Sequence, residues 1–116
     1  MNSASNDCLT ILVVEDVDWI RAGMKKSLMA YGHHVLEATD NEEAISVAER
    51  FHPDLILTEE ELPTFDTLIR SVREHSTLGN ISIVIINPDA EDGDGDVVII
   101  TDYSQLKNVL TLRRKS

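Results

Sequence analysis

The sequence predicts an α/β fold in which helices cover both faces of a parallel sheet. Short runs of β-branched and aliphatic residues alternate along the chain with segments whose apolar residues recur at helical spacing. Short connections join these segments, and they favour right-handed crossovers between parallel strands. With 116 residues, of which 42% are hydrophobic, the chain is long enough for one domain with one core. In such a fold, ligands are expected outside the carboxyl ends of the strands.

The first strand is expected at residues 9–14, LTILVV, whose apolar character is typical of a strand buried on both faces. Glu15 and Asp16 follow it directly. A helix is expected next, with Asp18 as its cap and an end near Gly32. Its inward side should carry the apolar residues that recur at helical spacing, which are Ile20, Met24, Leu28 and Tyr31.

The second strand and helix have a recognisable junction. A strand is expected at residues 34–38, and the stretch TDNEE at residues 39–43 then places a glutamate three residues after a capping residue. This capping-box pattern predicts a helix that ends before Pro53. The residues expected to face inward are Ala44, Ile45, Ala48 and Phe51.

Further strands are expected at residues 54–58, 81–86 and 97–100, with a helix at residues 65–75 and a closing helix after the last strand. These helices should bury Leu68, Ile69 and Val72, and then Leu106, Val109, Leu110 and Leu112. Residues 87–96 are acidic and lack apolar periodicity, so a loop is expected there. Because ten residues are close to the shortest parallel crossover, an antiparallel pairing of the last two strands is the alternative.

The charge balance excludes several classes of protein. With 21 acidic and 10 basic residues the formal net charge is −11, so direct binding to nucleic acid is not expected. No apolar run approaches the roughly 18 residues of a membrane span. Cys8 is the single cysteine, which excludes an internal disulfide and fits a cytoplasmic protein. Surface positions are expected for the histidines, which are His33, His34, His52 and His75.

Carboxylates gather where the predicted strands end. Glu15 and Asp16 end the first strand and Glu59 ends the third, so in a sheet of order 2-1-3-4-5 they converge at one edge. Oxygen donors from separate strands suit a hard cation such as Mg²⁺. The sequence therefore predicts an acidic pocket in which Mg²⁺ is a candidate ligand but not a required cofactor. Trp19 follows the acidic pair and either covers this pocket or packs elsewhere.

Four stretches of the chain resemble the receiver domains of two-component response regulators. They are ILVVED at 11–16, HVLEATDNEEAI at 34–45, PDLIL at 53–57, and Pro63. The resemblance implies a flavodoxin-like (CheY-like) doubly wound fold over residues 9–113, with five parallel strands in the order 2-1-3-4-5 and an acidic loop in place of the fourth helix. Residues 1–8 are then expected to be a flexible N-terminus and residues 114–116 a tail. The implied role is cytoplasmic, non-enzymatic signal transduction in a phosphorelay.

The residues that carry phosphorylation in this family are altered here. In the family, an acidic pair holds Mg²⁺, and an aspartate four residues before the proline accepts phosphate from a histidine kinase; Glu59 stands at that place. Asn87 stands at the switch position, where serine or threonine is usual, and residues 99–101 contain no lysine. One extra methylene displaces the acceptor oxygens by about 1 Å, which can cost on the order of a hundredfold in rate. The resemblance therefore implies a pseudo-receiver without the phosphoacceptor aspartate.

These substitutions lead to a functional hypothesis, a phosphorylation-independent protein–protein interaction module. Without a fourth helix, the apolar strands at residues 81–86 and 97–100 should leave an exposed face for a protein partner or for a second copy in a dimer. A first alternative is a constitutively active receiver in which Glu59 imitates phosphoaspartate. A second alternative is a Toprim-like metal-dependent nucleic-acid enzyme, which ILVVED together with IVIINPDAEDG at 83–93 would fit.

Overall fold

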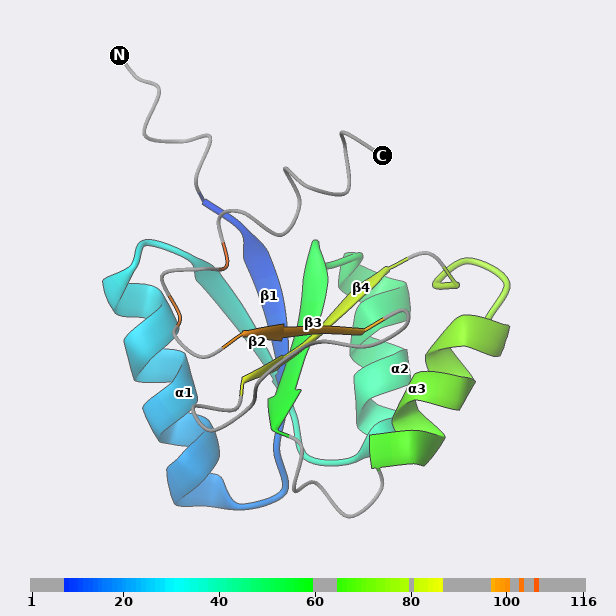
Figure 1. Ribbon diagram of the computed structural model, residues 1–116, viewed down its shortest axis with the longest axis horizontal. Helices are drawn as coiled ribbons and strands as arrows, with labels where there is room; N and C mark the ends of the chain where they lie inside the picture. The colour runs from blue at the N-terminus through cyan, green and yellow to red at the C-terminus, as the bar shows by residue number, and fades with distance from the viewer. Residues whose placement is uncertain are drawn as a thin grey trace.

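A computed structural model describes residues 8–59, 65–79, 81–86 and 97–100, together with Tyr103 and Leu106. Within this part of the chain the strands form one sheet in the order β2-β1-β3-β4-β5. Helix α1 lies on one face of the sheet, and α2 and α3 lie side by side on the other (Figure 1). The strands are β1 (Thr10–Val14), β2 (His34–Ala38), β3 (Leu55–Glu59), β4 (Ser82–Ile86) and β5 (Val97–Ile100). The helices are α1 (Asp18–Ala30), α2 (Asn41–Phe51) and α3 (Phe65–Glu74).

The register of the sheet brings the carboxyl ends of its strands to one edge. Val14, the last residue of β1, pairs in parallel with Ala38 of β2 and with Thr58 of β3. Glu59 of β3 pairs with Ile86 of β4, and β5 lies beside β4 in the parallel direction. The predicted parallel sheet with the strand order 2-1-3-4 is therefore confirmed. The predicted acidic loop between β4 and β5 lies outside the described residues.

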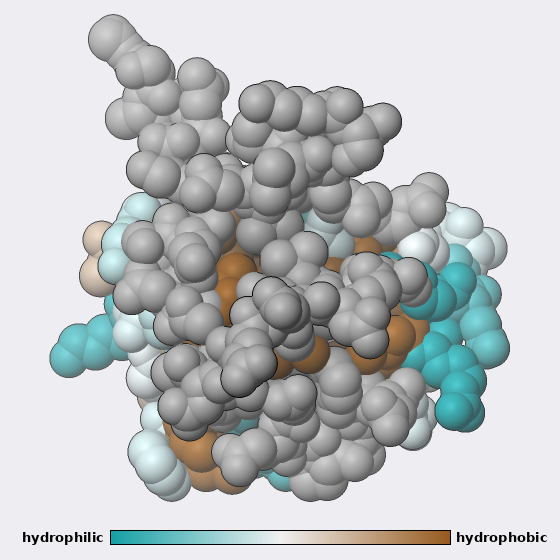
Figure 2. All heavy atoms as spheres, in the orientation of Figure 1, coloured by the Kyte–Doolittle hydropathy of each residue, from teal (hydrophilic) through white to brown (hydrophobic). Residues whose placement is uncertain are grey.

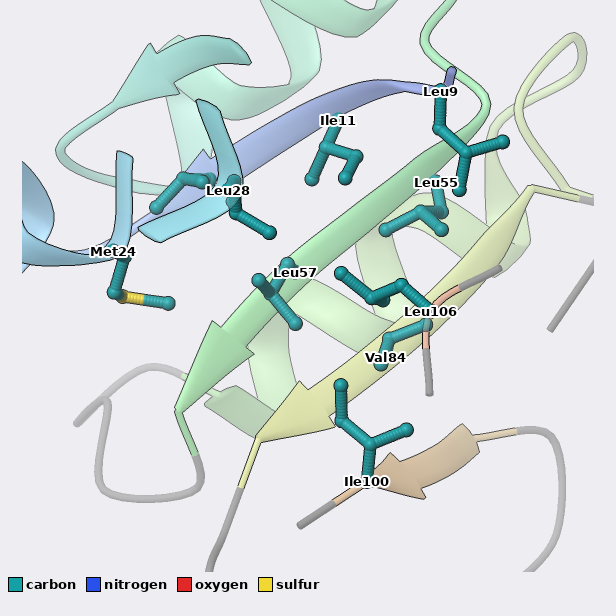
Figure 3. Packing of buried hydrophobic residues seen from close by; sticks show 10 residues of the cluster. Leu9, Ile11, Met24, Leu28, Leu55, Leu57, Val84, Ile100 and Leu106 are labelled. Atoms are coloured by element: carbon teal, nitrogen blue, oxygen red, sulfur yellow. The ribbon is translucent and has the colours of Figure 1, made fainter. Parts of the chain in front are cut away.

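Two hydrophobic clusters, one on each face of the sheet, form the core. Side chains alternate along a strand, so Ile11 and Val13 of β1 face α1, whereas Leu12 and Val14 face α2 and α3. The cluster beneath α1 contains Leu9, Ile11, Val13, Met24, Leu28, Leu55, Leu57, Val84, Ile100 and Leu106 (Figure 3). The opposite cluster contains Leu12, Val14, Ala38, Ala44, Ala48, Ile56, Leu68, Val72, Leu78 and Ile83. The expectation of a first strand buried on both faces is confirmed.

Helix α1 buries Met24 and Leu28 and ends near Gly32, as predicted, but its start and the position of Tyr31 differ from the expectation. Asp18 is the first helical residue and not the cap; Val17 holds the cap position without a side-chain hydrogen bond. Tyr31 was expected to face inward and is 52% exposed. It lies beyond the last helical residue, just before Gly32, whose φ of +89° turns the chain toward β2.

Helix α2 begins with the predicted capping arrangement. The Asp40 carboxylate accepts a hydrogen bond from the Glu43 backbone N–H at 2.8 Å, and the Glu43 carboxylate accepts one from the Thr39 backbone N–H at 2.7 Å. These contacts satisfy donors that a helix start leaves unpaired. The inward position of Phe51 was predicted wrongly, since this side chain is 54% exposed. The helix ends at Phe51, and the chain changes direction at His52, whose backbone is left-handed. No further helical turn therefore packs over the Phe51 side chain.

Helix α3 buries Leu68 and Val72 and packs Ile69 against the same cluster, as predicted. Leu106 is fully buried in the cluster beneath α1, and its burial was predicted. The other residues predicted for that helix, Val109, Leu110 and Leu112, lie outside the described residues. Among the helices that the structure describes, none is long and apolar enough to cross a membrane.

His33 was predicted to lie at the surface, and this was wrong. Its side chain is only 7% exposed, and its Nδ1 atom accepts a hydrogen bond from the Leu9 backbone N–H at 3.1 Å. His34 is exposed, as expected. The difference arises because β1 and β2 pair in parallel, which brings the residue before β2 against the start of β1.

The predicted uncovered face on β4 is not found. Residues Ser82 to Ile85 are buried within the single chain, Ile86 is half-buried, and Ile100 of β5 is buried. On the face shown in Figure 2, hydrophobic residues are visible in small patches near the centre, and hydrophilic residues gather at the side where α3 lies in Figure 1. An exposed hydrophobic face was the basis for predicting an interface on β4 and β5, and for β4 this expectation was wrong. The side chains of residues 97–99 lie outside the description.

A first prediction concerns Ser82, whose buried hydroxyl oxygen has no hydrogen-bond partner among the residues that the structure describes. A buried hydroxyl without a partner costs about 1–3 kcal/mol, so Ser82→Ala should raise the free energy of unfolding by about 1 kcal/mol in urea titrations.

Thr58→Val is the matched control, because the Thr58 hydroxyl donates to the Val14 carbonyl oxygen at 3.0 Å. Removing this satisfied hydroxyl should lower the free energy of unfolding by about 1 kcal/mol. A Ser82→Ala protein that is less stable than the wild type would contradict the assignment.

Candidate functional site

The carboxyl edge of the sheet carries the acidic residues that the sequence singled out. Glu15 and Asp16 follow β1 directly, and Glu59 is the last residue of β3. Because Val14 and Thr58 are paired across β1 and β3, the next residue of each strand, Glu15 and Glu59, comes next at the same edge. The side chain of Glu59 lies outside the described residues, as do Pro63 and Asn87.

Glu15 and Asp16 lie in different environments. Glu15 is only 3% exposed; its Oε2 atom accepts a hydrogen bond from the Val17 backbone N–H at 2.9 Å, and its own backbone N–H donates to the Ala38 carbonyl at 3.1 Å. Asp16 is exposed. Glu15 therefore holds the loop after β1 in place, whereas Asp16 presents its carboxylate to solvent.

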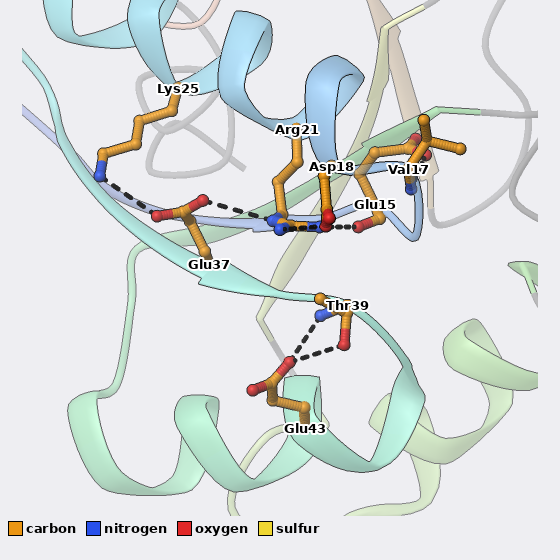
Figure 4. Close-up of polar contacts among 8 residues, drawn as sticks. All are labelled: Glu15, Val17, Asp18, Arg21, Lys25, Glu37, Thr39 and Glu43. Atoms are coloured by element: carbon orange, nitrogen blue, oxygen red, sulfur yellow. Dashed lines mark hydrogen bonds and ion pairs between the residues drawn. The ribbon is translucent and has the colours of Figure 1, made fainter.

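Arg21 of α1 joins this loop to β2, and the sequence analysis missed it. Its guanidinium donates to the Glu15 backbone carbonyl at 2.9 Å, to the Asp18 carboxylate at 2.7 Å and to the Glu37 carboxylate at 3.3 Å (Figure 4). The hydrogen bond that Arg21 donates to the Asp18 carboxylate raises the pKa of Arg21 above its ordinary value. The spacing of Asp18 and Arg21, three residues apart on a helix, is the signal that could have identified the pair.

Lys25 extends the same ionic network, since its ammonium group lies 3.2 Å from the second Glu37 oxygen. The Lys25 side chain is 42% exposed, whereas that of Arg21 is 14% exposed. Solvent therefore screens the lysine pair more strongly, and the arginine carries most of the structural role. Glu37 of β2 accepts from both cations, so the network ties α1 to the edge strand.

Trp19 neither packs in the core nor fills a pocket in the described part of the chain. It lies in the first turn of α1, and 77% of its surface is exposed. The sequence left open whether this side chain would cover the acidic residues or pack. Its position, three residues after Asp16, makes it an exposed fluorophore close to the carboxyl edge.

The described residues do not by themselves form a metal site. Among them, no group of three or more histidine, cysteine, aspartate or glutamate side chains is placed to hold a metal ion. Glu15 and Asp16 offer the carboxylate oxygens that Mg²⁺ prefers. The third member of the predicted set, Glu59, has its backbone at the same edge.

Comparison with known proteins identifies the class. Residues 11–99 match the response regulator receiver domain family, and the chain belongs to this family. It is 31% identical over 98 residues to the transcriptional regulatory protein AfsQ1 of Streptomyces coelicolor, covering 78% of this chain and 44% of that protein. It is 34% identical over 88 residues to the response regulator PleD of Caulobacter vibrioides, covering 74% of this chain and 19% of that one.

The fold is also that of solved receiver domains. The receiver domain of the sensor histidine kinase PA1611 from Pseudomonas aeruginosa, with magnesium in its active-site cleft, superposes with a TM-score of 0.72 at 23% identity, covering 93% of this chain and 98% of that one. The flavodoxin-like, CheY-like class is thus confirmed. The chain spans less than half the length of the two curated relatives above.

Family membership fixes the general role. Receiver domains are signalling modules of two-component systems that interact with other proteins, and they are typically not enzymes. The role in signal transduction predicted from the sequence is confirmed at this level. The match gives no support to the Toprim-like alternative.

A second prediction tests the Arg21 network. Arg21→Met removes the donor to the Glu15 carbonyl and should lower the free energy of unfolding by about 1–2 kcal/mol, because a charged hydrogen bond to backbone is lost. Chemical denaturation followed by circular dichroism measures the change.

Lys25→Met is the matched control, and it should cost less than about 0.5 kcal/mol, as is usual for an exposed ion pair. The loss of unfolding free energy in Arg21→Lys should lie between the losses in Arg21→Met and Lys25→Met. Lysine lacks the planar fork that reaches several acceptors. Equal losses of unfolding free energy in Arg21→Met and Lys25→Met would show that the contacts of Arg21 stabilise the fold no more than an exposed ion pair does.

Proposed function

We propose that this receiver domain works as a protein–protein interaction module whose state does not depend on phosphorylation. The observation that carries the proposal is the identity of the residue that ends β3, which is Glu59. It stands four residues before Pro63, where receivers resembling this chain carry the phosphoacceptor aspartate. Phosphoryl transfer depends mostly on positioning and charge stabilisation, so a carboxylate displaced by one methylene is a poor acceptor.

The neighbouring strand ends support the same conclusion. β4 ends at Ile86 and β5 at Ile100, so the residues that follow them in sequence are Asn87 and Thr101. Neither residue is a cation, and a lysine at this edge would be needed to pair with a phosphate on β3. A phosphorylated Glu59 would therefore add negative charge beside Glu15 without a compensating lysine from β5.

A second candidate function rests on the charge of Glu59. A glutamate carries its negative charge one methylene farther from the backbone than aspartate does, and a phosphoryl group on an aspartate also places charge farther out. The domain would then be a constitutively active receiver. This candidate requires a residue that senses the charge, and Asn87 at the switch position lacks the hydroxyl of serine or threonine.

A third prediction separates these functions through Glu59→Asp. Under the main proposal, neither the wild type nor Glu59→Asp gains a phosphoryl group from acetyl phosphate and Mg²⁺, as measured by intact-protein mass spectrometry. Glu59→Asp restores the aspartate but not the lysine that would pair with the phosphate. A receiver with the aspartate and lysine of the family serves as positive control. If Glu59→Asp is phosphorylated and its binding to a partner protein changes, the pocket still works as a switch and the proposal fails.

We also infer that Glu15, Asp16 and Glu59 form an acidic pocket able to hold Mg²⁺, which is not needed for folding. The magnesium in the receiver domain of PA1611 supports this inference, as does the oxygen-only chemistry of the three side chains. Three carboxylates at one edge repel one another, so a divalent cation there would relieve the repulsion.

A fourth prediction follows from this pocket. Mg²⁺ at about ten times its dissociation constant should stabilise the fold by about 1.4 kcal/mol and raise the Tm by several degrees. Asp16→Asn should abolish this rise without unfolding the protein, because Asp16 is exposed. Trp19 fluorescence provides a second readout. Equal stabilisation of the wild type and Asp16→Asn by Mg²⁺ would place the ion elsewhere.

A further inference from the structure

A groove between α2 and α3 lies on the face of the sheet opposite α1 (Figure 1). It has a volume of about 760 Å³. The residues from α2 are Asn41, Glu42, Ile45, Ser46 and Glu49, and those from α3 and its end are Thr67, Ser71, Glu74 and His75. Both helices are anchored beneath it by the same hydrophobic cluster, which includes Ala44, Ala48, Leu68 and Val72. The groove therefore has fixed walls.

The floor and rim of the groove differ in chemistry. Ile45 is half-buried and packs against the core, so it provides an apolar floor. Ser46, Thr67 and Ser71 are small and leave room above it. A groove with an apolar floor between two fixed helices is the kind of surface that accepts a third helix, packed through a few aliphatic anchors.

The charges on the rim all have one sign. Glu42, Glu49 and Glu74 line the groove, and no lysine or arginine is among its lining residues. His75 spans the gap: its Nε2 atom lies 3.1 Å from the Glu49 carboxylate, and its Nδ1 atom accepts from the Thr77 backbone N–H at 3.2 Å. In this arrangement Nδ1 is an acceptor, so Nε2 is the ring nitrogen that faces the Glu49 carboxylate as a donor. A partner with positive charge fits such a rim.

We propose that the α2–α3 groove binds a helix of a partner protein that carries lysine or arginine on both sides of one or two aliphatic anchors. The anchors contact Ile45, and the cations pair with Glu42 and Glu74. This inference rests on the proposed function and deepens it, because it names the surface and the partner chemistry of the interaction module. An acidic partner, or a nucleic acid, is repelled by the same carboxylates.

A second copy of the chain is disfavoured as the occupant. Its formal net charge of −11 opposes association with an equally acidic copy. The one basic run in the sequence is Arg113, Arg114 and Lys115, and its binding to the groove of another copy would produce a dimer or a chain of molecules. The oligomeric state therefore distinguishes the two occupants.

The test uses the full chain and a labelled synthetic helix of about 15 residues, long enough to be partly helical, with leucine on one face and lysine on both flanks. Fluorescence anisotropy at low salt measures binding. The double variant Glu42→Gln with Glu74→Gln should weaken binding about tenfold, because two partly exposed ion pairs are lost. Ser46→Trp, which fills the groove without changing charge, should weaken it at least as much.

The matched control is Ala22→Lys with Ala30→Lys, two exposed positions on α1. It raises the net charge by two, as the glutamine pair does, but on the opposite side of the sheet. Binding should change less than about twofold, and a peptide with glutamate in place of lysine should not bind. Thermal unfolding of each variant confirms that it is folded.

The proposal is overturned if the control pair weakens binding equally, if the acidic peptide binds equally well, or if the wild type is a dimer that the groove variants dissociate. The proposed function is tested separately by Glu59→Asp with acetyl phosphate, in which the groove plays no part. If the lysine peptide does not bind and the chain also resists phosphorylation, the groove proposal fails and the proposed function stands.

Discussion

The complete burial of β1 in the middle of a parallel sheet is the constraint on which the other features depend. Residues Ile11 to Val14 are fully buried because helices cover both faces and β2 and β3 flank both edges. Burying each such side chain contributes about 1.5–3 kcal/mol before entropy is subtracted. A shift of this strand by one residue would exchange its two faces, so the register is strongly determined. That register places Glu15 at the same edge as Glu59.

Polar contacts at the carboxyl edge hold the loop after β1 in the position that the packing of the core gives it. Glu15 is buried and bonded to the following backbone, and Arg21 holds the same loop against Glu37 of β2. These residues are part of the structural frame, and this limits the chemistry open to them. The residue at the end of β3 is Glu59, whose backbone the sheet holds at the same edge.

The carboxyl edge and the α2–α3 groove are separate surfaces with separate physical origins. The edge exists because parallel strands all end on the same side of a sheet. The groove exists because α2 and α3 pack on the same face through small and aliphatic side chains, including Ala44 and Val72. Loss of phosphorylation at the edge would leave the groove unchanged. A receiver fold can therefore remain useful as a rigid support for binding.

The sequence by itself determined the elements and their order, because β-branched runs, helical spacing and the Asp40–Glu43 cap are local patterns. It also placed Glu15, Asp16 and Glu59 at the strand ends. Only tertiary structure decided the rest: His33 is buried because two strands pair in parallel, Tyr31 and Phe51 are exposed because their helices end there, and β4 is covered. The contact between Arg21 and Glu37 and the α2–α3 groove were missed for the same reason. Such contacts join residues that are distant in sequence, and no local pattern encodes them.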